Sequence, residues 1–303
     1  MKEMKEYLLH FMNKLDFPRE AKKVFLDVNG IINANVNYKE EMDSIISKFY
    51  YNSGHNKPKE ILEELTHLSQ KMNINPYTMH LMFYMYCSRV LLDKYKESGV
   101  SLDIFWNSMF DLRYKLQECH VVYGVWGTFV GEWFPGFFTM ERYGLGRLQY
   151  ERIPFSYDKY IRNGHVVQKG DRVYNMHIPS AGPLTRDKRM DSYRRAYEFF
   201  KDELEGAPLV VVCHSWLLYP DNEKFYPKNS NIVDFMHDFE IIDSQDQDSF
   251  TDTWRVFGRD HDKAVDELPT DTSLQRAYID WLKAGNKTGG GFGILLFDGQ
   301  RIL

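Results

Sequence analysis

Residues 173–216 constrain the fold most, because they read as a strand, a sharp turn, a helix and a second strand. An apolar stripe on the helix, residues 186–205, predicts packing against a sheet: Tyr193, Ala196, Tyr197, Phe200 and Leu204. The second strand, 208–216, is an apolar run typical of a strand buried on both faces. Such a unit forms a right-handed parallel crossover. We therefore expect Ser180 and Cys213 near the carboxyl ends of adjacent strands, where ligands bind in open α/β sheets.

The turn before this helix has features that favour an anion. A strand that ends in a glycine-containing turn and opens a helix leaves several backbone N–H groups unpaired. Arg186, Lys188 and Arg189 add positive charge in the first helical turn, whereas Asp187 opposes it. The alternative is that Thr185 simply caps the helix and the cations are solvated. The residues expected to hold a phosphate are Ser180, Ala181, Gly182, Leu184, Thr185 and Arg186.

The periodicity of the chain changes near residue 120. Residues 1–120 have helical spacing, and the stretch 76–95, apolar nearly all round, predicts a central buried helix. Further elements are expected in residues 121–303: strands at 137–143, 148–154, 173–178, 239–243, 253–257 and 294–297, and helices at about 230–238 and 272–283. The aromatic connector 126–138 fits neither class, and we expect it at the seam between the halves, beside the acceptor cleft.

Composition excludes several classes of protein. With a net charge of -5 and cations scattered among acids, the chain lacks the basic surface that nucleic-acid binding needs. Three cysteines without CxxC spacing predict neither a disulfide framework nor a metal site, which fits a reducing cytoplasm. The N-terminal residues mix acids with bases, so we expect neither a secretory signal nor a membrane span. Oligomeric state is not indicated.

Four segments, with the order of the elements, resemble a known family. They are 177–184 (His-Ile-Pro-Ser-Ala-Gly-Pro-Leu), 212–218 (Val-Cys-His-Ser-Trp-Leu-Leu), 230–232 (Ser-Asn-Ile) and 272–277 (Thr-Ser-Leu-Gln-Arg-Ala). They look like segments of a bacterial group of GNAT-like acyltransferases, and the resemblance spans nearly the whole chain. It implies an α+β protein, with a helical N-terminal domain, 1–120, followed by a GNAT-like mixed-sheet α/β domain, 121–303.

The resemblance also implies a reaction. Acetyl-CoA or another acyl-CoA would be the co-substrate, a small-molecule or peptide amine the acceptor, and no metal would take part. GNAT enzymes hold the coenzyme diphosphate on backbone amides in a turn with the pattern Q/R-x-x-G-x-G/A. Residues 180–185 depart from it, with one glycine and a proline that removes a donor. An alternative therefore stays open: a non-catalytic GNAT-like module that binds a ligand or a partner.

Three side chains are candidate bases for this reaction. An amine must lose a proton when it attacks a thioester, and histidine suits that role near neutral pH. His214 is the first candidate and His177 the second, since both lie at expected strand ends, and Glu151 on an earlier strand is the third. Either histidine could instead be hydrogen-bonded within a packed sheet. A rival hydrolase would use Cys213 as nucleophile with His177, because strand alternation turns His214 to the other face.

Overall fold

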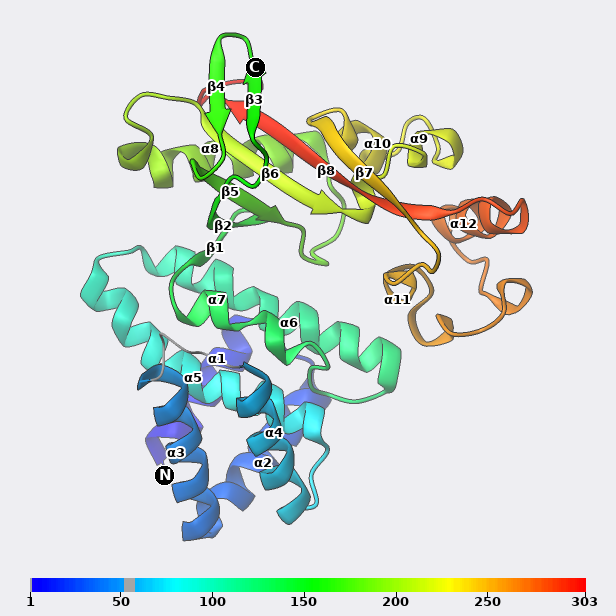
Figure 1. The fold of residues 1–303 in the computed structure, drawn as a ribbon. Coiled ribbons are helices and arrows are strands. Elements are labelled where there is room, and N and C mark those ends of the chain that lie inside the picture. The colour runs from blue at the N-terminus through cyan, green and yellow to red at the C-terminus, as the bar shows by residue number, and fades with distance from the viewer. Residues whose placement is uncertain (1, 52–57) are drawn as a thin grey trace. The chain divides into compact units, whose positions relative to one another are not determined.

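The computed structural model describes residues 2–51 and 58–303, and its contacts divide the chain into two units, Met1–Tyr143 and Gly144–Leu303 (Figure 1). The first unit is helical and the second is a mixed-sheet α/β unit, as the sequence predicts. The predicted domain boundary at residue 120 falls inside a helix, α6, which ends at Tyr123. The contacts place the division later, between Tyr143 and Gly144, because the connector after α6 packs with the helices.

A single helix, α5, forms the centre of the first unit. It contacts α1, α2, α3, α4, α6 and α7, and its burial confirms the prediction for residues 76–95. Asn75 caps it by accepting a hydrogen bond from the Tyr77 amide at 2.9 Å, and Gly99 ends it in the left-handed region. The elements of the unit are α1 (Lys2–Lys14), α2 (Arg19–Ala34), α3 (Val36–Tyr51), α4 (Pro58–Lys71), α5 (Pro76–Ser98), α6 (Leu102–Tyr123), η1 (Gly131–Trp133) and α7 (Pro135–Phe138).

The connector after α6 packs on the α5 helix. The Tyr84 hydroxyl donates to the Gly131 carbonyl at 2.7 Å, and the Tyr84 ring contacts the rings of Phe134 and Phe138. Pro135 opens a helical turn here, so the strand predicted for 137–143 is wrong in its first part. The observed strand begins only at Arg142.

The second unit is built on a six-stranded sheet with the order β1-β2-β5-β6-β8-β7, accompanied by a separate β3-β4 hairpin. Strands β5 and β6 are parallel, which confirms the predicted crossover. The strands are β1 (Arg142–Leu145), β2 (Leu148–Pro154), β3 (Lys159–Arg162), β4 (His165–Gln168), β5 (Arg172–His177), β6 (Leu209–Ser215), β7 (Glu240–Gln247) and β8 (Thr288–Phe297). The helices are α8 (Arg186–Leu204), η2 (Trp216–Leu218), α9 (Asn222–Phe225), α10 (Asn231–Met236), α11 (Thr253–Phe257), η3 (Gly258–Asp260), η4 (Val265–Glu267) and α12 (Ser273–Lys283).

The two faces of this sheet are covered differently. Helix α8 packs on one face, where the Tyr174 ring stacks on Phe200 with centroids 4.2 Å apart. On the other face, the hairpin residues Tyr160 and Val167 join a buried apolar cluster with sheet residues such as Val212. Apolar covering of this second face stops before the carboxyl ends of β5 and β6, where the strands carry Asn175, His177 and His214.

Two predictions for the C-terminal segment need correction. Residues 253–257, predicted as a strand, form the short helix α11, and the strand predicted at 294–297 begins earlier, at Thr288, and runs through a glycine-rich segment. The helix predicted at 272–283 is confirmed as α12, including its capping box between Thr272 and Gln275.

Candidate functional site

Strands β5 and β6 part soon after they meet. They pair at Tyr174 with Val211 and at Asn175 with Val212, and no further pairing between them occurs in the described sheet. Their outer neighbours stay paired to the strand ends: β2 reaches His177 of β5, and β8 reaches Ser215 of β6. Beyond Asn175 and Val212 the two strands separate, and such a parting of neighbouring strands is where ligands bind in open α/β sheets.

Two of the predicted catalytic residues meet beside this parting. Because Gln149 lies opposite His177 in the β2–β5 register and side chains alternate, Glu151 and His177 project from the same face, the one opposite α8. His177 Nε2 lies 2.9 Å from Glu151 Oε2 and 3.3 Å from Asn175 Nδ2. The His177 side chain is 18% exposed and the Glu151 side chain is 21% exposed, so the pair is sheltered yet reachable from solvent.

The Glu151 carboxylate selects one tautomer of the imidazole. A carboxylate accepts hydrogen bonds, so Nε2 carries the proton and its N–H donates to Glu151, while the lone pair lies on Nδ1. Asn175 Nδ2, itself a donor, is then a neighbour of Nε2 and not its hydrogen-bond partner. A carboxylate in this position also stabilises the imidazolium that forms when the ring takes up a proton. The pair is thus equipped for general-base chemistry.

The third candidate, His214, is exposed on the same face of the neighbouring strand β6. A Cβ on Gly290 of β8 would lie 3.5 Å from its Nε2, so the ring lies over β8. No hydrogen bond joins His214 to Glu151 or His177 among the contacts of the described residues. Cys213, one residue earlier, is 1% exposed on the opposite face, as alternation predicts.

The turn between β5 and α8 is held by an arginine that the sequence analysis did not single out. The Arg147 guanidinium donates to the carbonyls of Pro179 at 2.9 Å, Gly182 at 2.6 Å and Pro183 at 3.4 Å. Gly182 has a φ of +84°, which only glycine adopts without strain. Of the predicted donors, the Ala181 amide already binds the Pro179 carbonyl at 2.7 Å. The Gly182 and Leu184 amides have no partner among the described contacts.

Helix α8 begins without a side-chain cap. Thr185 occupies the N-cap position in an extended conformation, but its side chain makes no capping hydrogen bond, so the alternative of a simple Thr185 cap is wrong. In the first turn, hydrogen bonds to Thr185 and to the Lys188 and Asp187 amides lower the pKa of the Asp187 carboxyl, so these two amides are already engaged.

Two of the three cations predicted around this turn, Arg186 and Arg189, lie beside acids. Arg189 is fully buried and donates to Asp238 at 2.6 Å and to Asp234 at 2.7 Å. Arg186 lies 3.9 Å from Asp234 and 4.0 Å from Asp238. Arg189 also holds the pKa of the Asp234 carboxyl below its ordinary value. Arg189 is therefore not available to an anion at this turn, and Arg186 shares its charge with two acids.

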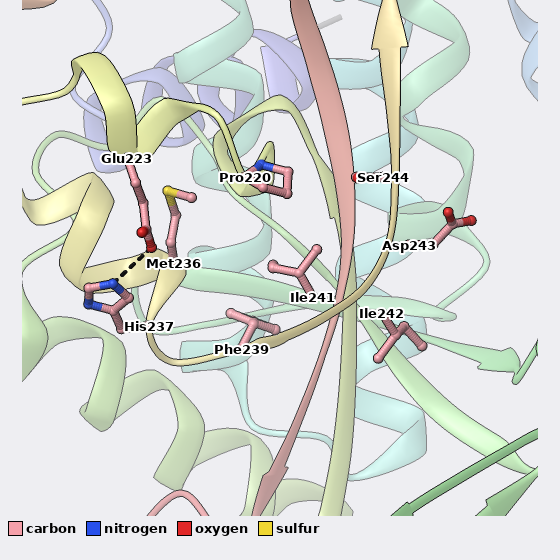
Figure 2. A pocket seen from close by; sticks show the side chains of 9 residues that line it. All are labelled: Pro220, Glu223, Met236, His237, Phe239, Ile241, Ile242, Asp243 and Ser244. Atoms are coloured by element: carbon pink, nitrogen blue, oxygen red, sulfur yellow. Dashed lines mark hydrogen bonds and ion pairs between the residues drawn. The ribbon is translucent and has the colours of Figure 1, made fainter.

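A pocket of about 470 Å³ lies elsewhere in the second unit, along the edge strand β7 (Figure 2). Met236, Phe239 and Ile241 give it apolar walls, and a His237–Glu223 pair at 2.9 Å flanks it. None of the predicted site residues lines this pocket. It is distinct from the parting of β5 and β6.

Neither a metal-ligand cluster nor a membrane-spanning helix is found in the part of the chain that the structure describes. Within residues 2–51 and 58–303, no three His, Cys, Asp or Glu side chains are grouped so as to hold a metal ion. None of the helices in those ranges combines the length and apolarity that crossing a bilayer requires.

Comparison with known families matches both units. Residues 143–295 match the family described as GNAT-like C-terminal domain, and residues 6–140 match the one described as N-acyltransferase N-terminal domain. No curated protein matches the sequence.

Solved structures give the same fold over nearly the full length. One is an acyltransferase in complex with decanoyl-CoA and teicoplanin, with a TM-score of 0.71 and 21% identity over 95% of this chain and 87% of that chain. An acyltransferase mutant in complex with octanoyl-CoA has a TM-score of 0.71 and 20% identity, over 96% and 88%. A complex with CoA and 10C-teicoplanin has a TM-score of 0.71 and 20% identity, over 95% and 87%.

Proposed function

The chain belongs to the acyltransferase family that joins an N-acyltransferase N-terminal domain to a GNAT-like C-terminal domain, and we propose that it transfers an acyl group from acyl-CoA to an amine. The observation that carries this proposal is the Glu151–His177 pair at the parting of β5 and β6, next to the turn that opens α8.

The parting strands suit an extended, amide-containing ligand arm. Backbone groups left unpaired at a strand edge bind such a chain as they would bind another strand. The coenzyme's pantetheine arm has this chemistry, and its diphosphate would lie at the 180–185 turn and the α8 N-terminus. The thioester would then lie near the carboxyl ends of the two strands, where His177 and His214 are found.

The reaction needs one base and no covalent enzyme intermediate. The amine nitrogen attacks the thioester carbonyl, the C–N bond forms and the C–S bond breaks. The coenzyme leaves as a thiolate, which then takes up the proton that the amine gave to the base. We assign the base to His177, which takes the amine proton on Nδ1 while Glu151 stabilises the resulting imidazolium. His214, the first candidate from the sequence, faces the same side without such a carboxylate partner among the described contacts.

The co-substrate range is proposed from related structures. Structures similar to this chain contain decanoyl-CoA, octanoyl-CoA or CoA, and two of them also contain teicoplanin. We propose acetyl-CoA or longer acyl-CoA as co-substrates, without a metal, and an amine acceptor on a small molecule or peptide. The three buried free cysteines fit a reducing compartment such as the cytoplasm.

Calorimetry with acetyl-, octanoyl- and decanoyl-CoA, followed by acyl-transfer assays on an amine panel, tests this function. The parent should bind at least one thioester, and His177→Gln should lower kcat by about 100-fold. His237→Gln is the matched control, because His237 forms a similar imidazole–carboxylate pair with Glu223 outside the site.

Two outcomes would contradict the proposal. Binding of no thioester by the parent would favour the non-catalytic module. Full activity of His177→Gln, with loss in His214→Gln, would transfer the role of base to His214.

A further inference from the structure

The Arg147 side chain belongs to no group so far assigned to the reaction, yet it organises the turn that the proposed function needs. Its Nη1, Nη2 and Nε atoms all donate to carbonyls of the 179–183 segment. A planar guanidinium offers several donors in a fixed fork, which a lysine ammonium does not. Arg147 thereby spans both ends of the turn with one rigid group.

The position of Arg147 is itself fixed by α8. Arg147 lies in the tight turn between β1 and β2, and the buried Ser192 hydroxyl contacts both sides of that turn: it donates to the Leu145 carbonyl and accepts from the Leu148 amide. Ser192 lies on α8, the helix that the 180–185 turn opens. The turn, the helix, the hairpin and Arg147 therefore form a closed ring of contacts, all within the second unit.

The direction of the carbonyls determines the direction of the amides. In a planar trans peptide the C=O and the following N–H point in opposite directions. Arg147 draws the Pro183 carbonyl toward itself, so the Leu184 amide points away from it. Arg189 does the same from inside the core with the Leu184 carbonyl, which turns the Thr185 amide outward. The Leu184 amide thus points away from Arg147, and the Thr185 amide points away from Arg189.

We propose that Arg147 is a positioning residue for diphosphate binding: it holds the carbonyls of the turn so that the Leu184 and Thr185 amides face the coenzyme. This inference rests on the proposed function, since it assigns the turn to the coenzyme diphosphate. Arg147 acts by holding the backbone carbonyls of the turn, so another positively charged side chain without its three donors would not replace it.

Calorimetry on the full chain tests this role with two probes, octanoyl-CoA and octanoyl-pantetheine, the second of which lacks the diphosphate. Arg147→Lys keeps the charge and Arg147→Gln removes it, and both lose the three-carbonyl fork. Each should weaken octanoyl-CoA binding by about tenfold and leave octanoyl-pantetheine binding unchanged. In kinetic assays KM for octanoyl-CoA should rise while kcat stays the same. Arg172→Lys is the matched control, since Arg172 pairs with Glu203 at the other end of β5.

The outcomes separate the two proposals. Binding of octanoyl-CoA by Arg147→Lys as tightly as by the parent would show that charge suffices, and the positioning role would be wrong while the acyltransferase function stands. Equal weakening toward both probes would also overturn it, because the effect would not depend on the diphosphate. Absence of octanoyl-CoA binding in the parent would remove the proposed function and this inference together.

Discussion

Cys213 lies one residue before a candidate base, on the face of the sheet that α8 covers. Burial raises the pKa of its thiol to about 12, so the nucleophilic thiolate is scarce at neutral pH. Its side chain also points away from the face that carries Glu151 and His177. A thiol-dependent hydrolase, the rival interpretation of the 213–215 segment, therefore lacks both an activated nucleophile and a base beside it.

The thiols of the native protein should be inert. All three cysteines, Cys87, Cys119 and Cys213, are buried, and burial raises the pKa of each. Titration with a thiol-reactive disulfide reagent at pH 8 should show no rapid reaction in the native state and three reactive groups after denaturation. Cys213→Ala should keep its acyl-transfer rate. Rapid labelling of Cys213 together with loss of activity would restore the thiol mechanism.

The sequence identified several candidate site residues, but it did not show which side chains they contact. His177 and Glu151 were both named as candidates, but their pairing depends on the β2–β5 register, which periodicity does not specify. The sequence did not indicate a role for Arg147, because an arginine in a hairpin turn is usually exposed to solvent. Its role arises only when the chain brings the 179–183 carbonyls to it.

Several glycines of β8 have close neighbours. Its glycine-rich start lies beneath η2 and beside Phe239, and a Cβ built on Gly291 would overlap the Leu218 carbonyl. On Gly293 a Cβ would come within 2.9 Å of the Phe239 side chain. These glycines allow the backbone of η2 to approach a central strand, which fixes the segment that follows the end of β6.

Alanine substitutions in β8 should therefore differ by position. Gly291→Ala should destabilise the protein by about 3 kcal/mol, because the backbone of η2 must move. Gly290→Ala is the matched control, since a Cβ at that position would meet His214 Nε2 at an ordinary contact distance of 3.5 Å. Denaturant unfolding monitored by fluorescence gives both values. Equal midpoints for the two variants would show that η2 does not press on the strand.

Elements with strong periodicity or a clear cap were predicted, including the short helix α10, whereas two other short elements were not. The α8 and α12 helices were recognisable from their stripes and caps. Residues 253–257 combine β-branched and aromatic side chains, yet they form a helix because that segment packs in a cluster of helices instead of joining the sheet. The β3-β4 hairpin was missed although Asn163-Gly164, both with positive φ, is a typical two-residue hairpin turn.

The division of the chain into two units leaves the aromatic connector with the helical one. Phe134, Phe137 and Phe138 are buried, and Tyr84 of α5 contacts the first and the last of them. Its predicted place beside the acceptor cleft stays a prediction.

Two fragments should behave differently as a result. A fragment of residues 121–303 would expose the connector aromatics that α5 normally covers, and a fragment of residues 141–303 would not carry them. We expect the longer fragment to self-associate and to bind a hydrophobic dye more strongly, as measured by size-exclusion chromatography and dye fluorescence. Identical behaviour of the two fragments would place the division nearer to residue 120.

The position of β8 between β6 and β7 also dictates an order of events during synthesis. β8 comes later in the chain than every other strand, but it occupies an inner place in the sheet. As the chain leaves the ribosome, the helical unit has all its helices long before β8 emerges. Until then β7 has no strand to pair with and the inner edge of β6 stays unpaired, so the nascent sheet exposes an edge on which another chain can add a strand.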